Sequence, residues 1–404
     1  MKKTKAGRIL LAGLASCLAL SALADGPTIK DVVVRQRWPW SRRVNIDYVL
    51  SDAPEKSPDI AVKMFNGTNS NALTIPVNSL CGDLYCVSNG VKRIVWDPTK
   101  TSYTNEQLTR FRVDITPVPA PLYLILDLTA SAGASNQIEY VYEADLITNK
   151  WGSWERDFIQ TNGVAIVESV IWTDVTNNPA FKKDKLVLRR IPAGRFGMGS
   201  NLVETTAGED FYAGVFEVTE AQWAMVITGN SVINGKPKVR ISYDDVRGAT
   251  TNLPTVDWPM TGSLVSPESF MGQLRAKTGV GGFDLPSEVQ WEYLCRAGTI
   301  TDFNDGFAVA SSNSLNQLGW WFENCIALHP VGEKRPNAWG LYDTHGNAHE
   351  FCLDLYNSLP GKRLVRGGSY SSPNLEYCSS YYSNYGLSDT GYSNRGLRLI
   401  WNLQ

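Results

Sequence analysis

The sequence predicts two domains, an all-β sandwich followed by a mixed α+β domain with little regular secondary structure. Short runs of alternating apolar and polar residues, separated by turn residues, fill positions 27–150, a pattern typical of a sandwich. Residues 184–404 instead combine a few capped helix starts with frequent Gly, Pro and Asn. A chain of 404 residues, 43% hydrophobic and 11% aromatic, is long enough for two cores. We place a connector between them at 151–183.

Four runs define the expected strands of the N-terminal domain. Residues 44–50 place every second, apolar residue on one face, and residues 60–65 alternate in the same way. Residues 110–115 put three apolar side chains inward and three charged ones outward. Residues 122–128 are apolar almost throughout, as expected for a strand at the centre of the sandwich. This spacing favours a β-sandwich of the immunoglobulin or fibronectin type.

Three helices are expected in the C-terminal domain. Residues 219–222 have the Thr-x-x-Gln form of a capping box, and residues 287–290 have the equivalent Ser-x-x-Gln form. A further helix opens at Ser266-Pro267 and ends before Gly279. Later glycines, prolines and asparagines are too frequent for long elements. Disulfides or a bound ion could therefore help this domain to hold its shape.

Residues 1–24 have the composition of a signal peptide. Four basic residues precede an apolar run that ends in Ala22-Leu23-Ala24, which offers small residues to a signal peptidase. A lipoprotein box ending at Cys17 is the alternative, although apolar residues follow Cys17 where a lipidated cysteine usually enters a polar tether. No other stretch approaches the length needed to span a bilayer. We therefore expect an exported protein without a membrane span, in the periplasm or outside the cell.

Charge and motif content exclude several classes of function. The 38 basic and 40 acidic residues nearly cancel, and no basic stripe indicates binding to nucleic acid. The sequence contains no phosphate-cradling glycine loop, no nucleophile elbow and no HExxH motif.

Six cysteines follow the expected signal peptide, and an even number in an oxidising compartment indicates disulfides. Cys81 and Cys86 enclose four residues, so they could close a small loop. The other four are Cys295, Cys325, Cys352 and Cys378. They allow three pairings, of which we favour Cys295 with Cys378.

Several motifs of the C-terminal domain resemble the formylglycine-generating enzyme, or sulfatase-modifying factor, family. They are the hairpin at 191–200, Glu217-Val218-Thr219, the helix at 284–293, and the segments 336–351, 363–370 and 394–399. The resemblance covers about 220 residues, from Leu186 to the C-terminus. It implies a C-type-lectin-like fold. The family oxidises a cysteine of a target sulfatase, using copper held by two cysteines.

The resemblance also implies a structural calcium site. Asp343, Gly346, Ala348 and Glu350 match the family positions that carry this ion. Calcium binds several oxygens on a bent backbone, and two carboxylates flanking a Gly-Asn turn, with the Gly346 and Ala348 carbonyls between them, can supply these.

The copper pair of the family is missing at its expected positions. The family cysteines lie three and eight residues after the serine of a Gly-Gly-Ser turn, which here is Ser369, and these offsets fall on Ser372 and Tyr377. Cys378 lies one position further, so a one-residue insertion would bring it into register with a single thiolate. Copper(I) requires soft thiolates, so copper binding is not expected. Ser369 and Cys378 remain the candidate reactive residues.

Two functions are therefore open. The first is a binding or structural module without oxidase activity, whose partner is a protein, a peptide or a glycan. Six tyrosines interleaved with Ser and Asn, a composition typical of binding surfaces, support it: Tyr370, Tyr377, Tyr381, Tyr382, Tyr385 and Tyr392. The second is a formylglycine-generating oxidase in which Cys378 pairs with another thiol, such as Cys325 or Cys352.

Overall fold

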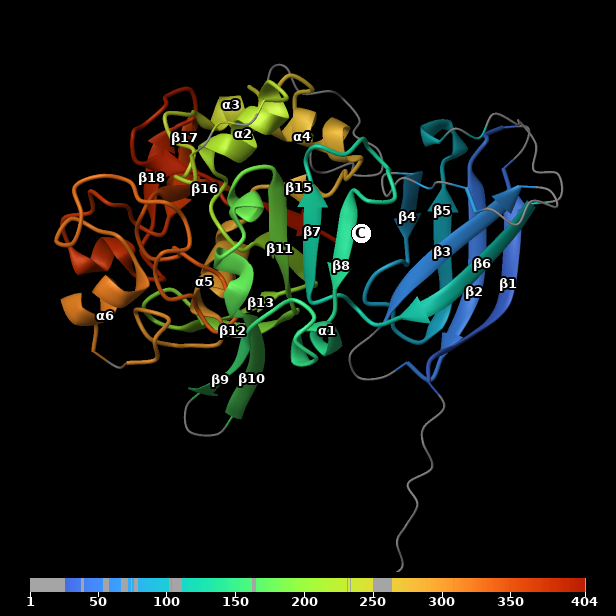
Figure 1. The fold of residues 1–404 in the computed structure, drawn as a ribbon, viewed down its shortest axis with the longest axis horizontal. Coiled ribbons are helices and arrows are strands. Elements are labelled where there is room, and N and C mark those ends of the chain that lie inside the picture. Colours follow the sequence, from blue (N-terminus) through green and yellow to red (C-terminus); the bar gives the residue numbers. More distant parts are fainter. Residues whose placement is uncertain are drawn as a thin grey trace, which may run out of the picture.

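The structure is a computed structural model that describes residues 26–37, 40–53, 58–66, 72–73, 75, 79–101, 103, 111–161, 165–230, 232, 234–249, 264–307 and 309–403. A β-rich N-terminal part lies beside a larger C-terminal part with mostly short strands and few helices (Figure 1). The expected signal peptide at 1–24, with Cys17, lies outside the described residues. Within them, no helix is long and apolar enough to cross a membrane.

The N-terminal part contains a four-stranded sheet of order β1-β2-β5-β4 and a two-stranded sheet, β3-β6. Its strands are β1 (Thr28–Gln36), β2 (Val44–Ser51), β3 (Asp59–Asn66), β4 (Leu80–Gly82), β5 (Gly90–Trp96) and β6 (Phe111–Val118). The alternation predicted for 44–50 is confirmed, since Val44, Ile46, Tyr48 and Leu50 are at most 1% exposed. They form one apolar cluster with residues of β3, β5 and β6. Burial between the two sheets therefore holds this part together.

The run at 122–128 does not belong to the N-terminal sheets, contrary to the expectation of a sandwich strand. It forms β7 (Tyr123–Asp127), which lies between β8 (Ile138–Val141) and β11 (Lys185–Ile191) in a six-stranded sheet of the C-terminal part. Leu124 and Leu126 of β7 join one apolar cluster, while Tyr123 and Ile125 join another on the opposite face. Burial on both faces explains why the run is apolar throughout.

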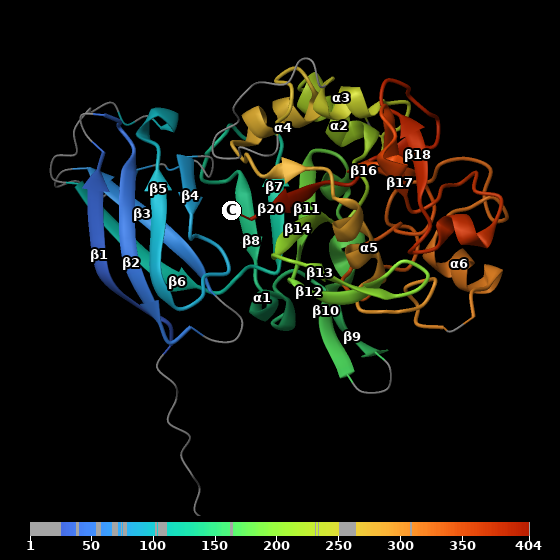
Figure 2. The same cartoon turned by 180° about the vertical axis from the view of Figure 1, so that it is seen from behind.

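The six-stranded sheet has the order β15-β20-β14-β11-β7-β8 (Figure 2). Its remaining strands are β14 (Phe211–Gly214), β15 (Phe283–Asp284) and β20 (Ile400–Asn402). The C-terminal strand β20 thus pairs with segments that lie far earlier in the sequence.

The expected connector at 151–183 contains regular structure. It forms a hairpin of β9 (Trp154–Thr161) and β10 (Ala165–Trp172), followed by two short 3-10 helices. The hairpin projects from the C-terminal part (Figure 1). Trp172 at its base packs against Tyr123 and Phe181, so it is anchored to the sheet.

Helix ends follow the capping signals in the sequence. The helices are α1 (Glu143–Ile147), α2 (Glu220–Ile227), α3 (Tyr243–Arg247), α4 (Phe270–Thr278), α5 (Glu288–Arg296) and α6 (Ser312–Leu318). The capping boxes of Thr219 and Ser287 both form, as predicted. The helix expected to open at Ser266 begins later, because Ser269 provides the cap, but it ends at Gly279 in the left-handed conformation as expected.

Two small sheets complete the C-terminal part. A hairpin of β12 (Gly194–Met198) and β13 (Val203–Ala207) contacts α5. The second sheet has the order β18-β17-β16-β19. Its strands are β16 (His349–Leu355), β17 (Lys362–Arg366), β18 (Asn384–Leu387) and β19 (Arg395–Gly396).

A buried ion cluster joins the two parts of the chain. Arg190 of β11 pairs with Asp59 of β3 at 3.0 Å and with Asp210 at 2.9 Å. The same guanidinium donates to the Cys86 sulfur at 2.6 Å. Beside it, the rings of Tyr85 and Trp401 lie 6.2 Å apart, edge to face. The tip of the 81–86 loop is therefore fixed to the C-terminal sheet.

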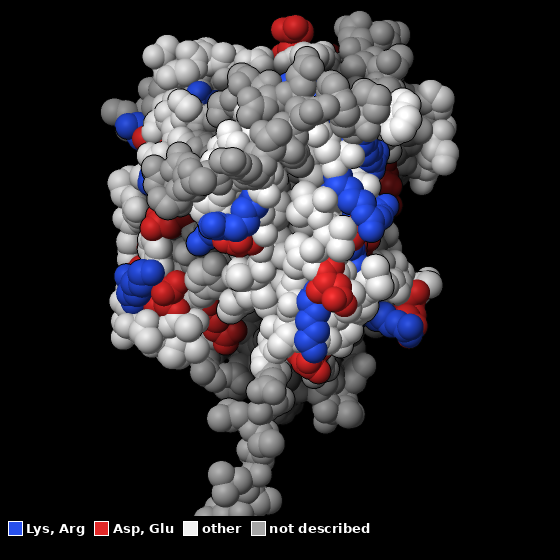
Figure 3. All heavy atoms as spheres, turned by 90° about the vertical axis from the view of Figure 1, so that its right-hand side faces the viewer, with Lys and Arg blue, Asp and Glu red and all other residues white. Residues whose placement is uncertain are grey.

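The outer face of the N-terminal part carries charges of both signs. Basic and acidic side chains alternate over this face without a field of one sign (Figure 3). Several are paired, such as Arg93 with Asp47 and Arg112 with Asp114.

Candidate functional site

The Gly-Gly-Ser turn begins where β17 ends, and its geometry requires glycine. Gly367 and Gly368 have φ values of +87° and +74°, a region that side chains disfavour. A Cβ atom on Gly368 would lie 2.4 Å from the Cys378 sulfur. The turn therefore presses its backbone directly against Cys378.

Hydroxyl and amide groups surround Ser369, which is fully buried. The Ser369 backbone N–H donates to the Ser372 hydroxyl at 2.9 Å. The Ser369 hydroxyl lies 3.2 Å from that of Ser371, and the Asn394 amide donates to Ser371 at 3.0 Å and to Ser369 at 3.4 Å. No histidine or carboxylate in the described part of the chain bonds to the Ser369 hydroxyl, so the general base that a serine nucleophile needs is absent there. Ser369 thus stabilises the turn.

Cys378 lies beside Ser372, the position where the family has its first reactive cysteine. Burial raises the pKa of the Cys378 thiol to about 12, although the nearby Ser372 hydroxyl acts in the opposite direction. Cys378 ends a 3-10 helix, Leu375–Cys378, and is fully buried. The turn thus brings together one hydroxyl and one protonated thiol.

The expected disulfides are absent, because all six cysteines of the described residues are free. The Cys86 sulfur instead accepts a hydrogen bond from the Arg190 guanidinium. The Cys295 sulfur faces the Thr344 carbonyl at 3.6 Å and the Ser380 hydroxyl at 3.7 Å, and it packs with Cys352 in an apolar cluster that does not include Cys378. The domain therefore keeps its shape by packing and buried polar networks.

His345 connects the loop 343–350 to Cys378, a link that sequence reasoning missed. Its Nδ1–H donates to the Cys378 carbonyl at 2.7 Å, and its Nε2 accepts from the Asn304 backbone N–H at 3.2 Å. Burial lowers the pKa of His345 to about 4, so the ring is neutral at physiological pH. The neutral imidazole therefore joins the Cys378 carbonyl to the Asn304 backbone through two hydrogen bonds.

The segment 343–350 folds into a tight loop against the Gly-Gly-Ser turn. Asp343 and Gly346 have φ values of +57° and +101°. A Cβ atom on Gly346 would lie 2.3 Å from the Trp320 carbonyl oxygen. The Gly346 N–H donates to the Gly367 carbonyl at 2.7 Å. The residues expected to bind calcium are thus placed directly beside the candidate reactive turn.

Three buried carboxylates surround one guanidinium beneath this loop. Glu350 pairs with Arg398 at 2.7 Å and accepts from the Trp291 indole at 2.6 Å. Glu217, which lies two residues before the Thr219 cap of α2, accepts from the Ala348 N–H at 2.9 Å and from the Asn347 amide at 2.7 Å. Sequence reasoning did not assign Glu217 to this site. Its place between buried Phe216 and Val218 is the signal that could have indicated a buried, partnered carboxylate.

Asp343 is the least satisfied carboxylate of this network. Its Oδ2 accepts from the Gly332 N–H at 2.7 Å, whereas its buried Oδ1 has no hydrogen-bond partner in the described residues. Burial raises the pKa of Asp343 to about 6, and burial together with Asp343 and Glu350 raises the pKa of Glu217. Excess negative charge beside an orphaned carboxylate oxygen suits a hard cation.

A calcium ion here would depend on backbone carbonyls. Across the described part of the chain, no group of three or more His, Cys, Asp or Glu side chains is arranged to hold a metal ion. Both oxygens of Glu350 already accept from Arg398, so Glu350 can offer a cation no more than its remaining lone pairs. Asp343 is the side chain best placed to bind one.

The tyrosines of the C-terminal loop lie at the surface, and each is partly exposed. Tyr377 packs on Tyr382 with ring centroids 4.7 Å apart and a tilt of 42°, and Tyr385 packs on Tyr356 at 5.1 Å. Lys362 lies over the Tyr385 ring at 4.3 Å. We use the name tyrosine surface for the six residues Tyr370, Tyr377, Tyr381, Tyr382, Tyr385 and Tyr392.

Comparisons with known proteins agree with the motif pattern. Residues 173–403 match the family described as sulfatase-modifying factor enzyme 1-like domain. The chaperone protein LppX of Paenibacillus barcinonensis is 25% identical over 253 residues, which are 54% of this chain and 89% of that protein. The formylglycine-generating enzyme of Streptomyces coelicolor is 30% identical over 145 residues, which are 28% of this chain and 44% of that enzyme. The chain thus spans less than half of the enzyme's length.

Two solved structures are also similar over about half of the chain. Treponema denticola variable protein 1 matches with 22% identity and a TM-score of 0.42, over 54% of this chain and 95% of that one. PvdO from Pseudomonas aeruginosa matches with 20% identity and a TM-score of 0.43, over 54% of this chain and 94% of that one. Through its residues 173–403, the chain belongs to the sulfatase-modifying factor family.

Proposed function

We propose that this protein is an exported, non-oxidising member of the family that binds a polypeptide partner. The observation that carries the proposal is the pairing of Ser372 with Cys378 beneath the Gly-Gly-Ser turn. Copper(I) needs soft thiolates, and this pair offers one hydroxyl and one thiol whose raised pKa keeps it protonated at neutral pH. Copper is therefore not part of the proposal.

The tyrosine surface is the proposed contact with the partner. Tyr377, Tyr382 and Tyr385 present partly exposed rings that combine apolar area with a hydroxyl group, the chemistry common at protein interfaces. The name of the Paenibacillus relative describes a chaperone, which supports a polypeptide as the partner.

We also propose a structural calcium ion bound by Asp343, the Gly346 and Ala348 carbonyls, and Glu350. Its support is the orphaned Asp343 oxygen within a network of three carboxylates and one guanidinium. The ion would neutralise this charge and stiffen the loop beside the Gly-Gly-Ser turn.

The finer architecture and the location of the protein belong to the same proposal. Two facing sheets support an immunoglobulin-like or fibronectin-like sandwich, here ending before β7. The family match supports a C-type-lectin-like arrangement for the rest. Export rests on the signal peptide expected at 1–24.

Copper(I) titration against a chelating competitor, in the absence of oxygen, tests the loss of the metal site. The natural protein is expected to bind no tight equivalent of copper. Ser372→Cys places a second sulfur beside Cys378 and is expected to create one tight equivalent. The Ser372→Cys/Cys378→Ser double variant, which again has one thiol here, is the matched control and should lose it.

The alternative is a formylglycine-generating oxidase with a rearranged pair. Cys325 bonds to the carbonyl of Trp321, which packs with Cys378 in one cluster, so Cys325 is the candidate for a second thiol. One tight copper equivalent in the natural protein, abolished by either Cys378→Ser or Cys325→Ser, would establish this alternative and contradict the proposal.

An array of peptides from exported proteins of the host tests the partner class. Tyr382→Ser/Tyr385→Ser is expected to weaken binding to the array, because it removes two rings of the tyrosine surface. Tyr140→Ser, which alters a tyrosine that is 46% exposed in β8, is the control and should bind normally. Equal binding by the two variants would count against the tyrosine surface as the contact.

A further inference from the structure

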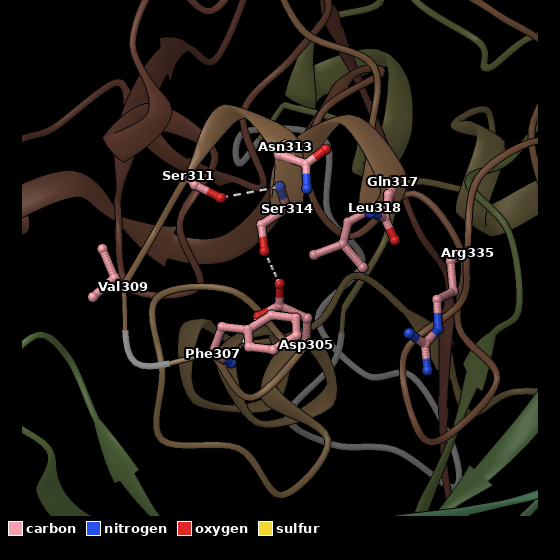
Figure 4. A pocket seen from close by; sticks show the side chains of 9 residues that line it. All are labelled: Asp305, Phe307, Val309, Ser311, Asn313, Ser314, Gln317, Leu318 and Arg335. Atoms are coloured by element: carbon pink, nitrogen blue, oxygen red, sulfur yellow. Dashed lines mark hydrogen bonds between the residues drawn. The ribbon is translucent and has the colours of Figure 1, made fainter.

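A pocket of about 440 Å3 opens beside α6, separate from the Gly-Gly-Ser turn (Figure 4). Its volume lies within the range typical of small-ligand sites. The lining residues that matter here are Asp305, Phe307, Val309, Asn313, Gln317 and Arg335. They come from α6, from the loop that precedes it and from the segment that follows.

One wall of the pocket is apolar and open to solvent. Phe307 is 67% exposed and Val309 is 78% exposed. These two neighbouring apolar side chains line the same pocket, and contiguous apolar area of this kind is more informative than a single exposed side chain. A ligand that stacks a weakly polar face on Phe307 would remove this apolar area from water.

The opposite wall offers two amides. Asn313 and Gln317 lie one turn apart on α6, and Figure 4 shows them on one side of the pocket with Phe307 across from them. Neither side chain makes a hydrogen bond within the described residues. An amide both donates and accepts, as does a sugar hydroxyl, so neighbouring hydroxyls on one ring can match this pair.

The charges of the pocket balance. Asp305 accepts from the Phe307 N–H at 3.1 Å and from the Ser314 hydroxyl, so its carboxylate shapes the loop. Arg335 supplies the single positive charge among the lining residues. One carboxylate and one guanidinium leave no net charge to attract a polyanion.

We propose that this pocket binds a neutral sugar ring of an oligosaccharide, with Phe307 stacking on the ring and Asn313 and Gln317 binding its hydroxyls. This inference goes beyond the proposed function and does not depend on the copper site. A buried cluster that includes Leu318 and Cys378 lies between the pocket and the Gly-Gly-Ser turn, so the two can be altered separately.

The test uses the full mature chain and four neutral trisaccharides: maltotriose, cellotriose, mannotriose and chitotriose. Saturation-transfer NMR and calorimetry would measure binding of each at up to millimolar concentrations. At least one is expected to bind. Phe307→Ala should weaken it about tenfold or more, and Asn313→Ala and Gln317→Ala about three- to tenfold each.

Phe322→Ala is the matched control, because Phe322 is 62% exposed but does not line the pocket, and its affinity should equal that of the natural protein. Phe307→Tyr, which keeps a ring, should retain binding. All these side chains are exposed, and thermal unfolding would verify that each variant folds.

Three outcomes would overturn the proposal. In the first, none of the four sugars binds. In the second, Phe307→Ala binds the sugars as well as the natural protein does. In the third, N-acetylphenylalanine amide binds in a Phe307-dependent manner while the sugars do not, which would assign the pocket to an apolar side chain of a protein partner.

Discussion

Replacing Asp343 by Asn tests the charge balance beneath the loop 343–350. The carboxylate is fully buried, one oxygen has no partner in the described residues, and burial raises its pKa from 3.8 to about 6. A rise of this size corresponds to about 3 kcal/mol of folding free energy. Because the pKa is raised in the folded state, this stability is fully present below the unfolded pKa and is lost as pH rises through about 6.

Between about pH 4 and pH 7, we expect the natural protein to lose about 2 kcal/mol of unfolding free energy relative to Asp343→Asn, because pH 4 already lies above the unfolded pKa of 3.8. Both proteins are measured with a chelator that removes calcium. Asp343 contributes to the raised pKa of Glu217, so the variant also relieves Glu217, which acts in the same direction. Urea denaturation of both proteins at each pH measures the difference.

Calcium should reverse this effect in the natural protein. If the ion binds Asp343, a concentration one hundred times the Kd stabilises the fold by about 2.7 kcal/mol, and Asp343→Asn should gain far less. Two results would refute the reasoning. One is a difference that stays constant with pH in chelator, and the other is equal stabilisation of the two proteins by calcium.

Three further predictions follow from the packing and the cysteine chemistry. Gly368→Ala should cost at least about 2 kcal/mol more unfolding free energy than Gly361→Ala, measured by urea denaturation. Both glycines have a similar φ, +74° and +72°, but an added Cβ atom meets the Cys378 sulfur at Gly368 and open space at Gly361. Equal costs would contradict this. Arg190→Met should cost about 3–5 kcal/mol by leaving Asp59 and Asp210 without their buried partner, whereas the exposed pair of Arg195 makes Arg195→Met a control expected to cost about 0–1 kcal/mol. Cys378 should resist alkylation by iodoacetamide in the folded protein at about pH 8, since its raised pKa leaves about one thiolate in ten thousand. Peptide mapping against partly exposed Cys325 measures this, and equal labelling of the two would show that Cys378 is accessible and ionised.

Local patterns predicted local structure well. The alternation in β2 and the capping boxes of α2 and α5 depend on residues within one element, and each formed as expected. The run at 122–128 was assigned to the wrong sheet because an apolar strand does not specify its partner. Its pairing with β11 bridges about sixty residues of chain that contain a hairpin, and no local signal encodes it.

The candidate site was predictable to the extent that its motif is local. The segment 343–350 was recognised from its own residues, whereas its contact with the Gly-Gly-Ser turn was seen only in the structure. The roles of Glu217 and His345 were not predicted, because each depends on a contact with a distant segment. The disulfide predictions were wrong for a related reason: a cysteine count does not reveal that Arg190 or the Thr344 carbonyl occupies the space beside a sulfur.

Oxidation of a peptide with the sequence Cys-x-Pro-x-Arg, incubated with the mature protein, copper and oxygen, tests the central proposal most directly. Mass spectrometry would follow conversion of the peptide cysteine to the aldehyde. A hydroxyl beside a protonated thiol at the Gly-Gly-Ser turn predicts no conversion above a protein-free control. Catalytic accumulation of the aldehyde, lost in Cys378→Ser, would contradict that prediction and identify the protein as an active oxidase.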